Sequence, residues 1–164
     1  MARAASARPA AAEGDPYEVA VRYLANRPRS VSEIRRHLRS KRFADAAIDR
    51  AIDALRAQRY IDDEAFARYW LEQRERFRQR GDRALVSELL DKGVARETID
   101  GVLGERAPDT EVRQAREAVR HMLSRWAGLE EGERKRRMHA HLARRGFSYE
   151  TIEEVLARPG DDAD

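Results

Sequence analysis

A pattern of five apolar residues recurs three times along the chain, and it constrains the fold more than any other feature. Its members are spaced by 4, 5, 5 and 4 residues in every copy. A spacing of four places two side chains on one helix face, whereas a step of five across a turn breaks the helical phase. Each copy therefore predicts two helices that meet at a corner filled by the middle residue. The copies are Ile34, Leu38, Phe43, Ile48 and Ile52; Leu85, Leu89, Val94, Ile99 and Leu103; and Met138, Leu142, Phe147, Ile152 and Leu156.

A third helix is predicted upstream of each pair. Asp15, followed by a proline, is typical of a helix N-terminus, and Ser30 with Glu33 matches a capping box for the next helix. Asp62 and Asp109 are the corresponding N-caps in the second and third copies. No stretch shows the alternation of a strand. We therefore predict an all-α chain whose three tandem three-helix modules form an elongated, curved array.

The predicted boundaries follow from these helices. We expect a disordered N-terminal tail over residues 1–14, modules over 15–60, 61–106 and 107–158, and an acidic C-terminal tail over 159–164. The first tail lacks the apolar segment of a secretory signal, and a transit peptide is the alternative to a flexible tail.

Particular side chains are expected to support the modules. Gly93 and Gly146 precede two of the corner residues, where a helix end favours left-handed backbone, and Arg42 stands there in the first module with some strain expected. Trp70 is predicted to pack within or between modules rather than to stack on a ligand. Phe66, Trp70, Gln73 and Phe77 are predicted to lie on one side of the same helix.

Charge is distributed in blocks, although the net charge is only +3. Such blocks favour a polyanion or another charged surface as partner, and helices that alternate charge for solubility are the alternative. Basic blocks of +6, +3 and +6 cover residues 27–43, 66–83 and 112–147, and acidic blocks of −3, −4 and −5 cover 44–65, 84–111 and 148–164.

Basic side chains in these blocks are the candidate contacts. Ile34 and Leu38 are expected to face inward, whereas Arg35, Arg39 and Arg42, spaced i, i+4 and i+7, are expected to form an outward stripe. Four cations at the start of a helix in the third module oppose the helix dipole, and a bound anion would explain them. The full set is Arg35, Arg36, Arg39, Arg42, Arg74, Arg76, Arg78, Arg80, Arg83, Arg134, Lys135, Arg136, Arg137, Arg144 and Arg145.

The sequence offers little catalytic chemistry. It has no cysteine, its four histidines lack the spacing of metal ligands, and it has no phosphate-binding loop or nucleophile–base motif. We therefore expect no enzymatic activity, no cofactor and no metal. No apolar run is long enough to cross a bilayer, so we expect a cytoplasmic protein without a membrane partner, and a monomer.

Several runs together resemble the RecX family of regulatory proteins. The runs are Tyr60-Ile61-Asp62-Asp63 with Phe66-Ala67; Arg144-Arg145-Gly146-Phe147-Ser148-Tyr149-Glu150 with Ile152 and Leu156; and Ala20 and Leu24 with Arg27-Pro28-Arg29-Ser30, Arg35-Arg36 and Leu38. Their order and spacing over about residues 16–157 carry the resemblance. Arg42 departs from the glycine that is usual at the first corner.

The resemblance implies a function that composition alone does not supply. RecX-like proteins bind the RecA recombinase and its DNA filament, lie in the helical groove of the filament, and restrain filament growth, ATP hydrolysis and strand exchange. Direct binding to single- or double-stranded DNA is also implied as an option. The alternative is a tandem helix-turn-helix DNA-binding protein. The acidic third helices, with Asp45, Asp49 and Asp53 in the first module, disfavour that alternative.

Overall fold

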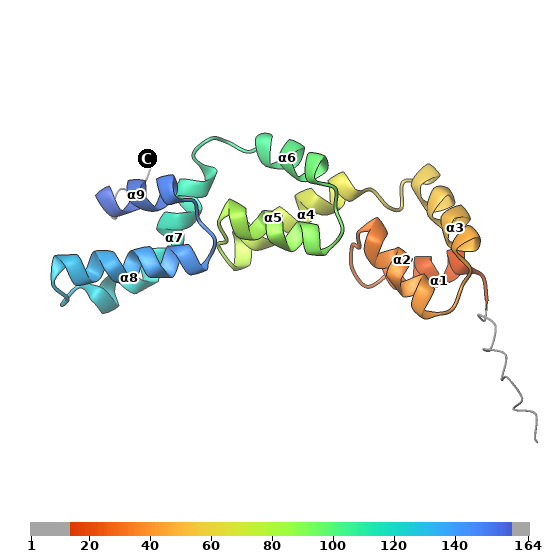
Figure 1. The fold of residues 1–164 in the computed structure, drawn as a ribbon, viewed down its shortest axis with the longest axis horizontal. Helices are drawn as coiled ribbons and strands as arrows, with labels where there is room; N and C mark the ends of the chain where they lie inside the picture. The colour runs from red at the N-terminus through yellow and green to blue at the C-terminus, as the bar shows by residue number, and fades with distance from the viewer. Residues whose placement is uncertain (1–13, 159–164) are drawn as a thin grey trace, which may run out of the picture. The chain divides into compact units, whose positions relative to one another are not determined.

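The computed structural model describes residues 14–158, and within them the chain forms nine α-helices and no strand (Figure 1). The predicted tails lie outside the described residues, except for Gly14. The helices are α1 (Pro16–Leu24), α2 (Val31–Ser40), α3 (Asp45–Ala57), α4 (Asp63–Phe77), α5 (Asp82–Asp91), α6 (Arg96–Gly104), α7 (Thr110–Trp126), α8 (Glu131–Arg144) and α9 (Tyr149–Ala157). The prediction of an all-α chain of three-helix modules is confirmed.

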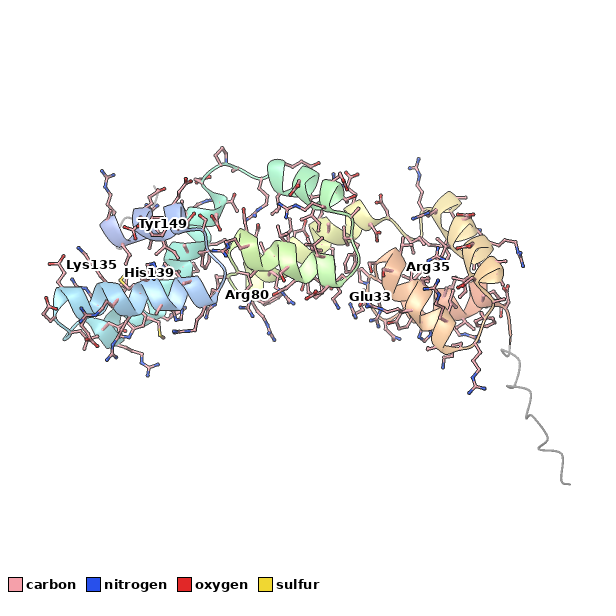
Figure 2. The ribbon with its side chains drawn as sticks, in the orientation of Figure 1. Glu33, Arg35, Arg80, Lys135, His139 and Tyr149 are labelled. Carbon is pink, nitrogen blue, oxygen red and sulfur yellow. The ribbon has the colours of Figure 1, made fainter. Side chains whose placement is uncertain are left out.

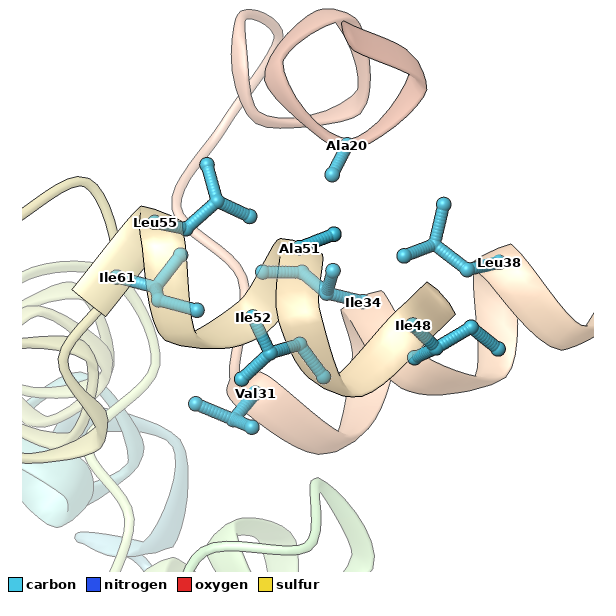
Figure 3. Packing of buried hydrophobic residues seen from close by; sticks show 9 residues of the cluster. All are labelled: Ala20, Val31, Ile34, Leu38, Ile48, Ala51, Ile52, Leu55 and Ile61. Carbon is cyan, nitrogen blue, oxygen red and sulfur yellow. The ribbon is translucent and has the colours of Figure 1, made fainter. Parts of the chain in front are cut away.

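The first compact unit runs to Asp62 and holds one three-helix module. Helices α1, α2 and α3 all contact one another and enclose an apolar core (Figure 3). Ile34, Leu38 and Ile48 are fully buried there, as the repeat predicts. The rest of the core consists of Ala20, Val31, Ala51, Ile52, Leu55 and Ile61.

The second compact unit begins at Asp63 and holds two three-helix modules. Helices α4, α5 and α6 pack around one core, and α7, α8 and α9 pack around another. Of the repeat residues in this unit, Leu103 and Leu156 are only half-buried, because Val102 and Val155 beside them face the cores.

Side-chain caps account for several helix starts. The Asp15 carboxylate accepts a 3.0 Å hydrogen bond from the Tyr17 amide, and Ser30 and Glu33 form the predicted capping box. Asp109 occupies the N-cap position of α7, but its carboxylate pairs with Arg113 at 3.0 Å instead of bonding the helix amides. Asp109 is therefore at the predicted position, but the prediction that its side chain caps the helix is wrong.

The corners between second and third helices use left-handed backbone in all three modules. The φ angles are +65° at Arg42, +77° at Gly93 and +82° at Gly146. An L-residue with a side chain pays roughly 1–2 kcal/mol for this conformation. The strain predicted at Arg42 is thus present in the backbone.

The two modules of the second unit are joined through backbone. The Gly81 amide donates to the Arg145 carbonyl at 3.0 Å, and the Arg83 amide donates to the Gly146 carbonyl at 3.2 Å. A Cβ atom on Gly81 would overlap the Phe147 backbone. The start of α5 and the α8–α9 corner therefore approach each other as closely as backbone allows.

A single carboxylate reinforces this junction. Glu111 on α7 accepts hydrogen bonds from the Asp82 amide at 2.9 Å and from the Ser148 amide at 3.2 Å. It also accepts from the Ser148 hydroxyl at 2.9 Å and the Thr151 hydroxyl at 2.5 Å. Burial raises the pKa of Glu111, but these hydrogen bonds together hold it below its usual value. The charged form is therefore the one that the junction stabilises.

Candidate functional site

The structure divides the fifteen predicted contact residues into two groups. Seven form ion pairs with nearby carboxylates: Arg35, Arg39, Arg74, Arg80, Lys135, Arg136 and Arg137. The other eight have no ion pair with any residue that the structure describes: Arg36, Arg42, Arg76, Arg78, Arg83, Arg134, Arg144 and Arg145. A cation without a local partner keeps its full charge for an external one.

The α2 stripe is partly neutralised within its own module. Arg35, labelled in Figure 2, pairs with Asp49 at 2.5 Å, and Arg39 pairs with Asp45 at 2.8 Å. Both carboxylates lie on α3. These pairs are exposed and contribute little to stability. Arg36 and Arg42 are exposed without such partners, so they carry the net positive charge of this face.

Three of the four cations at the start of α8 have ion-pair partners as well. Lys135, labelled in Figure 2, pairs with Glu131 at 2.8 Å, and Arg137 pairs with Glu133 at 2.9 Å. Hydrogen bonds from these cations lower the pKa of both glutamates. The carboxylates of the first turn thus supply the favourable dipole interaction that the cations lack. A bound anion is not needed to explain this cluster.

The end of α4 arranges its cations around aromatic rings. The Arg74 guanidinium lies 4.1 Å from the centre of the Trp70 ring, and it donates to Glu88 at 2.6 Å. Trp70 donates its indole N–H to the same carboxylate at 2.9 Å. Trp70 is therefore a packing residue, as predicted. Phe77, the last residue of α4, is 64% exposed.

A basic cavity of about 430 Å³ lies within the second unit. Arg78, Arg80, Arg144 and Arg145 contribute four guanidinium groups to its lining. Its remaining lining residues are Phe77, Gln79 and His141. The lining contains no carboxylate, which distinguishes the cavity from the α2 and α8 surfaces.

The backbone junction positions this cavity. Gly81 bonds to the carbonyl of Arg145, which brings the loop after α4 against the end of α8. The guanidinium of Arg145 donates to the carbonyls of Arg78 at 3.1 Å and Gln79 at 3.3 Å. All four arginines were candidates from the sequence. The sequence could not show that they converge, because Arg78 and Arg80 lie more than sixty residues before Arg144 and Arg145. Phe77 and His141 gave no sequence signal as cavity residues.

Two of the histidines, His37 and His141, contact aromatic rings. His37 stacks on Tyr23 with the ring centres 3.9 Å apart, and His141 contacts Trp126 edge-on. No group of three or more metal-ligating side chains occurs among residues 14–158. None of the helices described combines the length and the hydropathy that crossing a bilayer requires.

These observations define an all-α protein of three tandem three-helix modules with basic surfaces. Family models of the first, second and third three-helix domains of RecX match residues 17–55, 62–103 and 109–156. The chain therefore belongs to the RecX family.

Relatives agree with this assignment. The chain is 37% identical over 147 residues to the regulatory protein RecX of Geobacillus thermodenitrificans, covering 86% of this chain and 52% of that protein. It is 36% identical over 137 residues to the regulatory protein RecX of Mycobacterium leprae, covering 83% and 80%. The chain thus spans about half the length of the Geobacillus relative and four fifths of the mycobacterial one.

A solved structure shows the same fold. The crystal structure of RecX from Lactobacillus salivarius matches with a TM-score of 0.82 at 19% identity, covering 88% of this chain and 94% of that one. At this level of identity, the likeness concerns the fold and not the contacts of individual side chains.

Proposed function

We propose that this chain regulates the RecA recombinase by binding RecA and its DNA filament. It modulates, and usually inhibits, filament growth, ATP hydrolysis and strand exchange in recombination and repair. The observation that carries the proposal is the match of all three RecX domains in order along the chain. The curated relatives bear the name regulatory protein, which fits a protein that acts on another and not on a substrate of its own.

Electrostatic contacts supply much of the affinity in this proposal. The eight cations without ion pairs lie on α2 and its corner, around α4 and α5, and along α8, so both compact units offer basic surface. A filament provides DNA phosphates and acidic protein patches as partners. Affinity that comes from such contacts weakens as salt rises.

The test is the single-stranded-DNA-dependent ATPase of the cognate RecA, titrated with the full chain. A parallel measurement follows binding to the same DNA without RecA. Suppression of the ATPase at up to stoichiometric ratios, with weak binding to bare DNA, is the expected result. An unchanged ATPase together with tight, salt-sensitive binding to bare DNA would instead support a tandem helix-turn-helix DNA-binding protein.

A variant pair tests the basic surface of the first unit. Arg36→Gln with Arg42→Gln removes two charges that have no intramolecular partner, so the fold loses no ion pair. We expect the concentration needed for half-suppression to rise several-fold. Arg56→Gln is the matched control, because Arg56 is an exposed, unpaired arginine on α3 outside the candidate set. Equal behaviour of the double variant and the control would remove this surface from the interface.

A further inference from the structure

The arginine cavity of the second unit is built from two modules. Phe77, Arg78 and Arg80 lie at the end of α4 and in the loop that follows, whereas Arg144 and Arg145 lie at the end of α8. The backbone hydrogen bonds between the modules hold these two edges together. The cavity therefore exists only where the second and third modules are joined.

The positive charge of the cavity is largely uncompensated. Arg78 and Arg144 have no side-chain partner among the described residues, and Arg145 bonds only backbone carbonyls. Arg80 approaches Glu88 at 3.6 Å, but Arg74 already bonds that carboxylate at 2.6 Å. Among the described residues, Glu88 outside the lining is thus the one carboxylate that pairs with any of the four lining arginines, and Arg80 shares it with Arg74.

The geometry points to this cavity as a binding site for one phosphate of a single nucleic-acid strand, with the adjacent base stacked on Phe77. The inference rests on the proposed function, since it names the contact that the second unit makes with the DNA of the filament. It assigns the phosphate to Arg78, Arg80, Arg144 and Arg145.

A phosphate suits these four residues for two reasons. Guanidinium groups bind phosphate oxygens through paired N–H donors, and they do so most strongly where water is partly excluded. Four guanidinium groups share one lining, and burial and the nearby charge of Arg80 both lower the pKa of Arg145, in line with the repulsion expected between like charges. A bound anion would relieve that repulsion.

The aromatic rim favours a strand over a free phosphate ion. Phe77 is 64% exposed beside the cavity, and the Arg76 guanidinium lies 5.2 Å from the ring centre. Stacking of bases on exposed aromatic rings next to a basic groove is the usual way in which proteins hold single strands. A free phosphate would use the arginines but leave Phe77 without a role.

Binding of a short deoxythymidine oligonucleotide to the full chain, without RecA, tests the site directly. Arg78→Gln with Arg144→Gln should weaken binding about tenfold, and should reduce the steepness of its salt dependence by at most about 0.7, the value for one phosphate contact. Phe77→Ala should weaken binding by at least about fivefold with an unchanged salt dependence. The control is Arg125→Gln, an exposed and unpaired arginine on α7.

A spectroscopic measurement locates the ligand. His141 lines the cavity, and its Nε2 donates to the Ala118 carbonyl at 3.1 Å. Burial and the charges of Arg145 and Arg144 lower its pKa, against the Ala118 hydrogen bond, which raises it. An anion in the cavity offsets these charges, so the oligonucleotide should raise the pKa of His141 in an NMR titration. The other three histidines are internal controls, and His141→Gln assigns the signal.

The outcomes separate this inference from the proposed function. Equal oligonucleotide binding by the cavity variants, the control and the unmodified chain would overturn the site, even if RecA suppression persists. If inorganic phosphate shifts the pKa of His141 but the oligonucleotide does not, the assignment of a nucleic-acid strand as the ligand would be overturned. Loss of RecA suppression in the cavity variants with unchanged oligonucleotide binding would mean that the cavity takes acidic side chains of the recombinase instead. Absence of suppression by the unmodified chain would contradict the proposed function alone.

Discussion

The corners of the first and third modules share a backbone conformation but differ in their surroundings. Arg42 and Gly146 both have left-handed φ angles, +65° and +82°. Arg42 is exposed, whereas a Cβ atom on Gly146 would lie 2.5 Å from the Cβ of Ala84 on α5. The first corner thus accommodates a side chain on left-handed backbone, whereas at the third corner Ala84 of the neighbouring module leaves no room for one.

The largest expected loss of stability follows from adding a side chain at Gly146, where Ala84 leaves no space. Gly146→Ala adds both backbone strain and a clash with Ala84, and we expect it to reduce the free energy of unfolding by about 4 kcal/mol. Urea denaturation followed by circular dichroism measures the change. Gly101→Ala is the control, since no atom lies within 4 Å of its added Cβ and it sits inside α6. That variant should gain about 0.5–1 kcal/mol. Equal stability of both variants would contradict the close packing of the junction.

The apolar residues that fill the first and third corners, Phe43 and Phe147, should also differ, with the larger contribution to stability at the third corner. Phe147 is 1% exposed, whereas Phe43 is only half-buried. Truncation of Phe147 to alanine should cost about 3–5 kcal/mol, because it leaves a cavity in the core. Phe43→Ala should cost clearly less. Thermal melts of the two variants side by side would sharpen the comparison, and wild-type-like melting of Phe147→Ala would refute its role at the corner.

Removing the charge of the junction carboxylate should have a smaller, pH-dependent effect. The folded-state pKa of Glu111 lies below its usual value of 4.5. Its stabilisation is therefore present above the unfolded pKa and lost as the pH falls through the folded pKa. We expect Glu111→Gln to cost about 1–3 kcal/mol at neutral pH, and the difference from the unmodified chain to shrink in strong acid. If the difference in the free energy of unfolding between the two proteins grew on acidification, the lowered pKa of Glu111 would be contradicted.

The smallest expected effect is a gain at the first corner. Arg42→Gly relieves the left-handed strain but increases the freedom of the unfolded chain, so we expect a net stabilisation of about 0.5 kcal/mol. The shift of the urea midpoint measures it. Loss of stability would show that the Arg42 side chain makes a contact worth more than the strain.

The sequence predicted the cores well, because helical spacing depends only on local geometry. Ile34, Leu85 and Leu142 are fully buried, as the spacing requires. The ion pair of Arg35 with Asp49 was not predicted, since it depends on how α2 crosses α3. The arginine cavity depends on contacts between the loop after α4 and the corner after α8, which no local pattern records.

The Glu111 carboxylate caps two helices at once, because it accepts hydrogen bonds from the Asp82 amide that begins α5 and from the Ser148 amide that precedes α9. When the carboxylate breaks these hydrogen bonds, the starts of α5 and α9 lose a cap together. The amides at these two ends should therefore exchange with deuterium through one common opening, although they are far apart in the chain. We therefore expect the junction to make the second and third modules one cooperative unit in hydrogen exchange.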